Sequence, residues 1–401
     1  MDPELQLKMM DHKAVASNLS ANSGLQCASA SQTVVISANS FWNIANFREN
    51  LIRALVRDGH EVIAAAPQPD MEWSSKRGIE TASLSVDRSG LNPLRDALLL
   101  GQYFRLFKRN RVQIYLGFTI KPNIYGTLAA RLSGVVAIPN VSGLGTAFIA
   151  GGPLAWFIGR LYRVAFRDCP IVFFQNADDC ELFVSRGIVQ KRQARLLPGS
   201  GVDLERFIPT AQNHSQVIFL LIGRLLGDKG VREYVRAAEC LKAEHPEWRF
   251  QLLGPLDEGN RTAIRRTELE GWVDEGSIEY LGAADDVRPF ISRATAVVLP
   301  SYREGMPRTL LEAAAMGRPL VATDVPGNRQ LVEDGVNGML CRLRDWESLA
   351  EAMLAMGRIS AQERDAMGRS ARRLVESCYG EDRIISAYLE AIAQLHPARR
   401  V

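Results

Sequence analysis

Short apolar runs alternate with longer amphipathic stretches along most of this chain. The first unit has an apolar run at 33–39, a helical pattern at 48–58 and a second apolar run at 61–67. Continuous apolar strands separated by helices are typical of a parallel sheet that is covered on both faces. The pattern therefore predicts that the chain opens with a β-α-β unit.

Two series of such strands follow one another. The first continues at 112–118, 136–141 and 171–176, and the second has apolar runs at 217–224, 249–254, 278–282, 296–301 and 319–324. Helical patterns lie between the runs of both series. The sequence thus predicts an α/β protein with two doubly wound, Rossmann-like domains. Ligands of such sheets bind at the carboxyl ends of the strands, so we expect the two domains to face each other across a ligand-binding cleft.

The expected boundaries follow from changes in this pattern. Residues 1–31 are acidic and then rich in Ser, Ala and Asn, and predict a mobile leader. The first domain is expected at 32–195 and the second at 196–380, with the stretch 198–209 as linker. The closing segment, 381–401, contains an amphipathic pattern and is expected to form a helix that returns to the N-terminal domain.

Composition narrows the class of protein. The 401 residues contain 47% hydrophobic and 23% charged residues, close to the averages of globular proteins. The net charge of +3 argues against nucleic acid as the main partner. The six cysteines form no C-x-x-C pair and the five histidines have no metal-ligand spacing, so we expect a reducing compartment and neither a metal nor a cofactor.

No segment has the length of a membrane span. The longest nearly uncharged apolar run, 146–159, falls short of the roughly 20 residues that a spanning helix needs. The N-terminus has no apolar core of the kind found in signal peptides. We therefore expect a cytoplasmic protein.

The most informative passage is EGMPRTLLEAAAMGRPLVATDVPG at 304–327. It follows an apolar strand and opens a helix, with Pro307 suited to the first helical position. The free N–H groups of such a helix start favour an anion such as a phosphate. Glu304 and Glu312 could each accept hydrogen bonds from a pair of sugar hydroxyls. The alternative is that Glu304 caps the helix and Glu312 is a solvated helical residue.

A second passage, GRLLGDKG at 223–230, comes directly after another apolar strand. Arg224 and Lys229 bracket a turn that contains a glycine, and two cations at a strand end could clamp a diphosphate. The spacing is not that of a nucleoside-triphosphate loop. A solvated turn is the alternative for this passage taken alone, and the presence of two anion-favouring loops in one domain favours the diphosphate.

The combination of GR…DKG, E-G-M-P-x-x-x-x-E and a downstream VPG resembles retaining glycosyltransferase family 4, which has the GT-B fold. The similarity extends over nearly the whole chain beyond residue 31. The passages NSFWNIANFR (39–48), DRSGLNPL (87–94), TIKPNIYG (119–126) and VSGLGTAF (141–148) are similar to the branch that extends lipid-linked saccharides. That branch includes the bacterial N-acetylgalactosaminyltransferase of protein N-glycosylation and many O-antigen, lipopolysaccharide and exopolysaccharide enzymes.

The resemblance implies roles for individual residues. Arg224 and Lys229 would hold the diphosphate of a nucleotide sugar and stabilise the charge that develops on it, and Glu304 would contact the transferred sugar. The resemblance also implies a set of donor-binding residues: Glu312 at the ribose hydroxyls, Gly305, Met306 and Thr309 near the phosphate and sugar, and Gly282, with Gly254, beside the base. A UDP-sugar is expected ahead of a GDP-sugar as the donor.

The acceptor side departs from the pattern of the family. Many relatives have a glycine pair in the first loop and a histidine near the position of Ile120, whereas this chain has the expected loop SFWNIAN (40–46) and Lys121. Asn43, Asn46, Arg48 and Lys121 are therefore the expected acceptor-side contacts, with ordinary loop polarity as the alternative. An inverting transfer needs a positioned base, and His60 lies in a helix-to-strand turn, so a retaining route agrees better with the sequence.

Two segments of the first domain, 94–111 and 152–167, mix bulky apolar and basic residues. Such segments suit a helix that lies in a membrane interface, and a core-facing helix is the alternative. With a lipid-linked saccharide as acceptor, such as an undecaprenyl diphosphate glycan, we expect peripheral association with the inner face of the cytoplasmic membrane. The competing functions are a sugar-nucleotide 2-epimerase, which lacks the paired-Glu motif, and a non-catalytic sugar-nucleotide binder.

Overall fold

The computed structural model describes residues 31–87, 92–144, 152–212 and 214–395. These residues form two compact units. One contains the residues up to Ser200 together with those from Asp382 onward, and the other contains Gly201–Glu381. The expected leader lies outside the described residues except for Ser31, as do parts of the passages at 87–94, 141–148 and 146–159.

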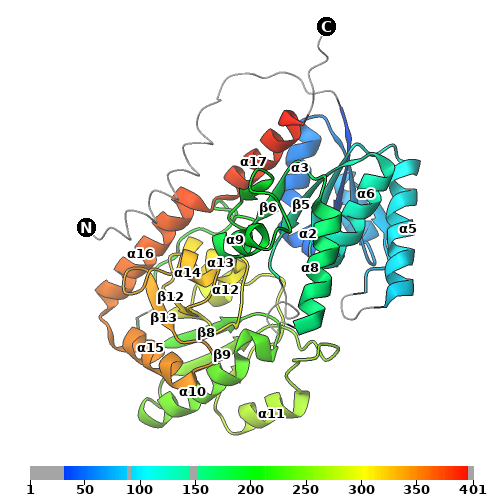
Figure 1. Cartoon of the computed structure of the whole chain (residues 1–401). Helices are drawn as coiled ribbons and strands as arrows, with labels where there is room; N and C mark the ends of the chain where they lie inside the picture. The colour runs from blue at the N-terminus through cyan, green and yellow to red at the C-terminus, as the bar shows by residue number, and fades with distance from the viewer. Residues whose placement is uncertain (1–30, 88–91, 145–151, 213, 396–401) are drawn as a thin grey trace. The chain divides into compact units, whose positions relative to one another are not determined.

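The N-terminal unit contains a seven-stranded parallel sheet with the order β3-β2-β1-β4-β5-β6-β7 (Figure 1). The strands are β1 (Thr33–Ser37), β2 (Glu61–Ala66), β3 (Glu80–Ser83), β4 (Ile114–Phe118), β5 (Val136–Val141), β6 (Val172–Phe174) and β7 (Ala194–Leu196). The doubly wound prediction is confirmed. The sequence analysis missed β3 and β7, which lie at the two edges and lack a continuous apolar run.

Helices cover both faces of this sheet. One face carries α5 (Pro93–Arg109), the π-helical η1 (Pro122–Gly126), α6 (Thr127–Ser133), α8 (Gly152–Phe166) and α9 (Ala177–Ser185), and the other carries α2 (Phe41–Phe47), α3 (Glu49–Arg57), α4 (Met71–Arg77) and α17 (Glu381–Gln394). Helix α17 packs Ile384, Tyr388 and Ile392 into the second face, where Asn140 Nδ2 donates to the Tyr388 hydroxyl at 2.7 Å. The closing segment is thus part of the N-terminal unit.

The passage after β1 is a helix, and its interpretation as a loop was wrong. Ser40 is the N-cap of α2 and its side chain accepts a hydrogen bond from the Asn43 N–H. Phe41 and Ile44 are buried one turn apart, which is the spacing of a helix face that packs on a core. A capping serine and this spacing favour a helix even though the segment is short.

The C-terminal unit contains a six-stranded parallel sheet with the order β10-β9-β8-β11-β12-β13. Its strands are β8 (Ile218–Ile222), β9 (Arg249–Leu253), β10 (Glu279–Tyr280), β11 (Ala296–Leu299), β12 (Leu320–Thr323) and β13 (Gly338–Cys341). One face is covered by α10 (Val231–Glu244), α11 (Arg266–Asp274) and α15 (Trp346–Arg358), and the other by α12 (Arg288–Ile291), α13 (Arg308–Ala315), α14 (Asn328–Leu331) and α16 (Ala361–Cys378).

Each sheet has one point where the order of winding reverses. In the N-terminal unit the chain winds from β1 to β2 on one side and from β4 to β5 on the other, and in the C-terminal unit β8 and β11 have the same relation. Ligands of open parallel sheets bind outside the carboxyl ends of the strands at this switch point. The loops after β1, β4, β8 and β11 are therefore the expected ligand-binding loops of the two sheets.

Candidate functional site

The two loops singled out in the C-terminal unit lie together at its switch point. The 3-10 turn η2 (Gly227–Lys229) follows β8, and the segment 300–307 follows β11. The Tyr302 N–H donates to the Asp228 carbonyl at 2.9 Å, and the Lys229 ammonium forms an ion pair with the Glu304 carboxylate. Since β8 and β11 are neighbours in the sheet, the fold brings these two charged groups together from positions 75 residues apart.

Two glycines permit the close approach of the loop backbones. Gly230 has φ +72° and a Cβ there would lie 2.1 Å from the Pro300 carbonyl oxygen. Gly327, the glycine of the VPG motif, has φ +86° and a Cβ would lie 2.3 Å from the Gly305 oxygen. Any larger residue would force the loops apart.

Glu312 lies on α13 with a side chain that is only 13% exposed, and Arg308 Nε is 2.8 Å from its Oε1. Burial raises the pKa of Glu312 above its usual range, against the opposing effect of the Arg308 guanidinium. The alternative interpretation of Glu312 as a solvated residue is therefore wrong. Helix α13 begins at Arg308, because Pro307 has the extended backbone of an N-cap, one residue later than expected.

The remaining donor-side residues line the same strand ends. Met306 is buried, and Thr309 Oγ1 donates to the Ile222 carbonyl at 3.3 Å, which ties α13 to the end of β8. Gly282 follows β10 and its carbonyl accepts the Gly254 N–H at 2.7 Å. The fold thus gathers the residues predicted for the donor around β8, β9, β10 and β11.

Arg224 has a partner that the sequence analysis missed. Its Nη1 lies 2.7 Å from Asp257 Oδ2, and the arginine side chain is 54% exposed. Asp257 belongs to the loop after β9, which lies outside the motifs found in the sequence. Its position beside Arg224 follows from the pairing of β8 with β9.

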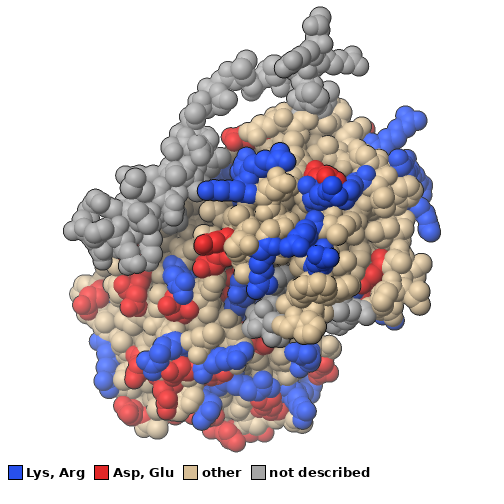
Figure 2. All heavy atoms as spheres, in the orientation of Figure 1, with Lys and Arg blue, Asp and Glu red and all other residues tan. Residues whose placement is uncertain are grey.

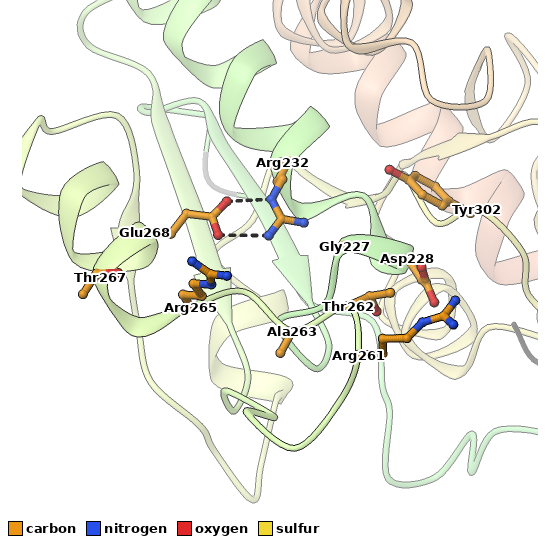
Figure 3. Close-up of a pocket in the computed structure, with 10 residues that line it drawn as sticks. All are labelled: Gly227, Asp228, Arg232, Arg261, Thr262, Ala263, Arg265, Thr267, Glu268 and Tyr302. Carbon is orange, nitrogen blue, oxygen red and sulfur yellow. Dashed lines mark hydrogen bonds and ion pairs between the residues drawn. The ribbon is translucent and has the colours of Figure 1, made fainter. Parts of the chain in front are cut away.

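A polar pocket of about 710 Å³ borders these loops (Figure 3). It shares Gly227 and Asp228 with the turn that carries Lys229, and Tyr302 with the loop that carries Glu304. On its far wall, Arg232 forms two hydrogen bonds with Glu268, at 2.6 and 2.9 Å. The Tyr302 hydroxyl donates to Glu233 at 2.6 Å. Tyr302 therefore lines the pocket and also ties the loop that carries Glu304 to α10.

The four residues predicted for the acceptor side are divided between two elements. Asn43 and Asn46 lie on α2, and the Asn46 side chain donates to the Trp42 carbonyl at 3.0 Å. Arg48 follows α2, is 4% exposed and stacks its guanidinium 4.0 Å from the centre of the Phe118 ring. The side chains of Asn46 and Arg48 are therefore held largely by the unit itself.

Lys121 lies after β4 and its charge is met by a buried carboxylate. Its Nζ is 2.7 Å from Asp96 Oδ1 on α5, and Asp96 also accepts the Tyr125 hydroxyl at 2.8 Å. Burial, reinforced by Asp96, raises the pKa of Tyr125. His60, considered above as a base, is buried with Nε2 3.3 Å from Asp58 Oδ2.

The described residues contain neither a metal-binding cluster nor a membrane-spanning helix. No group of three or more His, Cys, Asp or Glu side chains in these ranges is arranged to hold a metal ion. Within the same ranges, no helix is long and apolar enough to cross a membrane.

Comparison with known families identifies the class to which the two units belong. The family described as "Glycosyl transferase 4-like" matches residues 34–176, and the family "Glycosyl transferases group 1" matches residues 216–358. Sucrose-phosphate synthase from Thermosynechococcus elongatus has a similar fold, with a TM-score of 0.76 at 19% identity over 91% of this chain and 99% of that one. Anabaena HepE, solved with UDP-glucose, has a TM-score of 0.72 at 17% identity over 91% and 100%.

Two curated relatives share more of the sequence. The N,N'-diacetylbacillosaminyl-diphospho-undecaprenol alpha-1,3-N-acetylgalactosaminyltransferase of Campylobacter jejuni is 27% identical over 77% of this chain and 85% of its own length. The UDP-Gal:alpha-D-GlcNAc-diphosphoundecaprenol alpha-1,3-galactosyltransferase of Escherichia coli is 24% identical over 65% and 70%. The chain belongs to the GT-B glycosyltransferases with group 1 and 4-like domains, as the motifs predicted.

Proposed function

We propose that this protein is a retaining glycosyltransferase that moves a sugar from a UDP-sugar to a saccharide linked to a lipid diphosphate. The observation that carries the proposal is the ion pair between Lys229 and Glu304 at the switch point of the C-terminal unit. Arg224 and Lys229 both follow β8. A cation for the leaving diphosphate and an acceptor for sugar hydroxyls are then adjacent, as transfer from a nucleotide sugar requires.

Each donor-side residue has a distinct task in this proposal. Arg224 and Lys229 stabilise the negative charge that grows on the diphosphate as the glycosidic bond breaks, which favours the transition state over the bound substrate. Glu304 accepts hydrogen bonds from the transferred sugar. Glu312 accepts from the ribose hydroxyls, and its pairing with Arg308 fixes the direction of its carboxylate. No metal is needed for this division of charge.

Retention is supported by the residues at hand for proton transfer. In a same-face route the leaving diphosphate oxygen accepts the proton of the acceptor hydroxyl, so the protein need not supply a base. His60, the histidine considered as a general base, is buried next to Asp58. Lys121 forms an ion pair with Asp96, and in this proposal it binds the acceptor.

The lipid-linked acceptor is supported by the two curated relatives, whose names both specify a sugar linked to undecaprenol through a diphosphate. Helices α5 and α8 add a physical reason. Each packs one face on the core, through Tyr103 and Phe107 in α5 and Tyr162 and Phe166 in α8. The other face is exposed and mixes large apolar with basic side chains. It comprises Leu94, Leu98, Phe104, Arg105, Lys108, Leu154, Trp156, Phe157, Arg160 and Arg163.

Such a face suits a membrane surface of anionic lipid, with the basic groups at the headgroups and the apolar groups below them. Figure 2 shows Lys and Arg side chains interspersed with a broad uncharged surface over the part of the N-terminal unit that carries α8. We therefore propose peripheral attachment through the exposed faces of α5 and α8, next to the lipid that carries the acceptor.

The test is a panel of UDP- and GDP-sugars offered to the purified chain with undecaprenyl-diphosphate-linked saccharides in vesicles. Lipid product is scored by mass, and its anomeric configuration by NMR. We expect one UDP-sugar to give a product with the configuration of the donor, and Glu304→Gln to abolish it. Glu244→Gln, which weakens an exposed pair with Arg358 at the end of α10 remote from these loops, is the matched control. Product of inverted configuration, or full activity of Glu304→Gln, would contradict the proposal.

A further inference from the structure

Two uncommon backbone features adjoin at the carboxyl end of β4. Thr119 has φ +70°, in the left-handed region where the Cβ of a branched residue crowds the backbone. Residues 122–126, three positions further on, form a π-helical turn, which is rare and concentrates at functional sites. Both features persist only where the surrounding structure holds them in place.

The surroundings do hold them. The Asn39 N–H donates to Thr119 Oγ1 at 3.2 Å. The Tyr115 hydroxyl, from β4 itself, donates to the Pro122 carbonyl at 2.9 Å. Gly126 makes room for that hydroxyl, because a Cβ at Gly126 would lie 2.0 Å from it. The segment is thus tied by hydrogen bonds at Thr119 and at Pro122, and Gly126 packs against the ring of Tyr115.

The place of these contacts in the fold is specific. Asn39 follows β1 and Thr119 follows β4, and β1 and β4 are the neighbouring strands at the switch point of the N-terminal unit. The hydrogen bond between Asn39 and Thr119 therefore joins the two strand ends on either side of the crevice where a ligand of this sheet binds. Lys121 is held beside it by Asp96.

Thr119 differs from the other left-handed, non-glycine residues in the described ranges. The remaining non-glycine residues with positive φ are Gln68, Arg111 and Arg344, and none is β-branched. Arg111 directly follows the C-cap of α5, where a left-handed residue is the ordinary way to end a helix. At Thr119 a glycine would adopt the same φ without crowding. The hydrogen bond that the threonine side chain accepts from the Asn39 N–H explains why a threonine occupies this position.

We propose that Thr119 is a positioning residue for the acceptor saccharide. By accepting the Asn39 N–H, it fixes the distance between the ends of β1 and β4 and the place where the helical segment with Lys121 begins. The ends of β1 and β4 and the segment with Lys121 are then already in position when the acceptor binds, so no rearrangement precedes transfer. This inference rests on the proposed function, which supplies the acceptor.

Three variants separate the side chain from the strain. Thr119→Val keeps the branched shape and removes the acceptor oxygen, Thr119→Gly removes the crowding and the oxygen, and Thr119→Ser keeps the oxygen. We measure kcat and KM for the lipid-linked acceptor, UDP release from the donor without acceptor, and the melting temperature. Arg111→Gly relieves a left-handed residue outside the crevice and is the control.

We expect the KM for the acceptor to rise about 10- to 100-fold in Thr119→Val and Thr119→Gly, with UDP release unchanged. Thr119→Ser and Arg111→Gly are expected to match the unaltered chain in kcat, acceptor KM and UDP release. An unchanged acceptor KM in Thr119→Val, or a loss of UDP release in step with transfer, would overturn the inference alone. Absence of transfer by the unaltered chain would overturn the proposed function, and this inference with it.

Discussion

Replacing Glu312 by glutamine tests the donor site at a buried charge. The substitution keeps the shape of the side chain and removes one of the two charges in its pair with Arg308. In our proposal the carboxylate binds the ribose of the donor in both the ground state and the transition state. Losing a charged hydrogen bond costs about 1.5–3 kcal/mol, which corresponds to a rise of about 10- to 150-fold in the donor KM with kcat little changed.

The same substitution has a consequence for stability that depends on pH. Because burial raises the pKa of Glu312, the folded state binds its proton more tightly than the unfolded state does. The stability from this proton is fully present below the unfolded carboxyl pKa and is lost as the pH rises through the raised pKa of the folded state. Glutamine has no such titration, so the advantage of the unaltered chain over Glu312→Gln shrinks as the pH rises from about 4, the ordinary carboxyl pKa, through the raised pKa of the folded state.

The assays are initial rates at varied UDP-sugar with saturating acceptor, and urea unfolding of both chains at several pH values. Glu333→Gln is the control for the loss of one negative charge. Glu333 is exposed and directly follows the C-cap residue of α14. A donor KM equal to that of the unaltered chain would refute the ribose role. An advantage over Glu312→Gln that grows with pH would refute the reasoning from burial.

Three further predictions follow from single contacts. Lys229→Ala is expected to lower kcat about 100- to 1000-fold, since a preorganised charge at the leaving group is lost, and a steady-state kcat near that of the unaltered chain would exclude the role. Tyr388→Phe leaves the buried Asn140 amide without its partner and is expected to lower the free energy of unfolding by about 1–3 kcal/mol, measured by urea titration, with donor KM unchanged. Trp156→Ser removes a side chain that is 65% exposed and is expected to weaken sedimentation with anionic vesicles about 10-fold or more. Equal sedimentation of both chains would show that α8 does not enter the membrane.

Much of the fold could be predicted from the sequence because buried parallel strands are continuous apolar runs. The strands β5, β8 and β11 coincide with such runs to within a few residues. Strands β3 and β7 are paired on one side only and have few buried side chains, so hydrophobicity gave no signal for them. Helix α2 was missed because its seven residues provide too little periodicity, although its serine cap was visible.

The donor loops were predictable for a related reason. Glycines, a helix start and charged residues occur there at short, fixed spacings, so Arg224, Lys229, Glu304 and Glu312 could be chosen from the sequence. The partners of these charges could not. Asp257 beside Arg224 and Asp96 beside Lys121 lie 33 and 25 residues away, and side chains that far apart meet only through strand pairing and helix packing.

The sequence by itself thus determined the class of fold, the family and the identity of the charged groups, because each of these is written in local periodicity or in a short motif. The tertiary structure alone decided which of those groups are paired or buried. It paired Lys229 with Glu304, buried the Glu312 side chain on α13 beside Arg308, and set Thr119 in a strained conformation bonded to Asn39. The physical reason is that desolvation, ion pairing and backbone strain depend on which residues are neighbours in space. The order of the strands in the two sheets determines those neighbours.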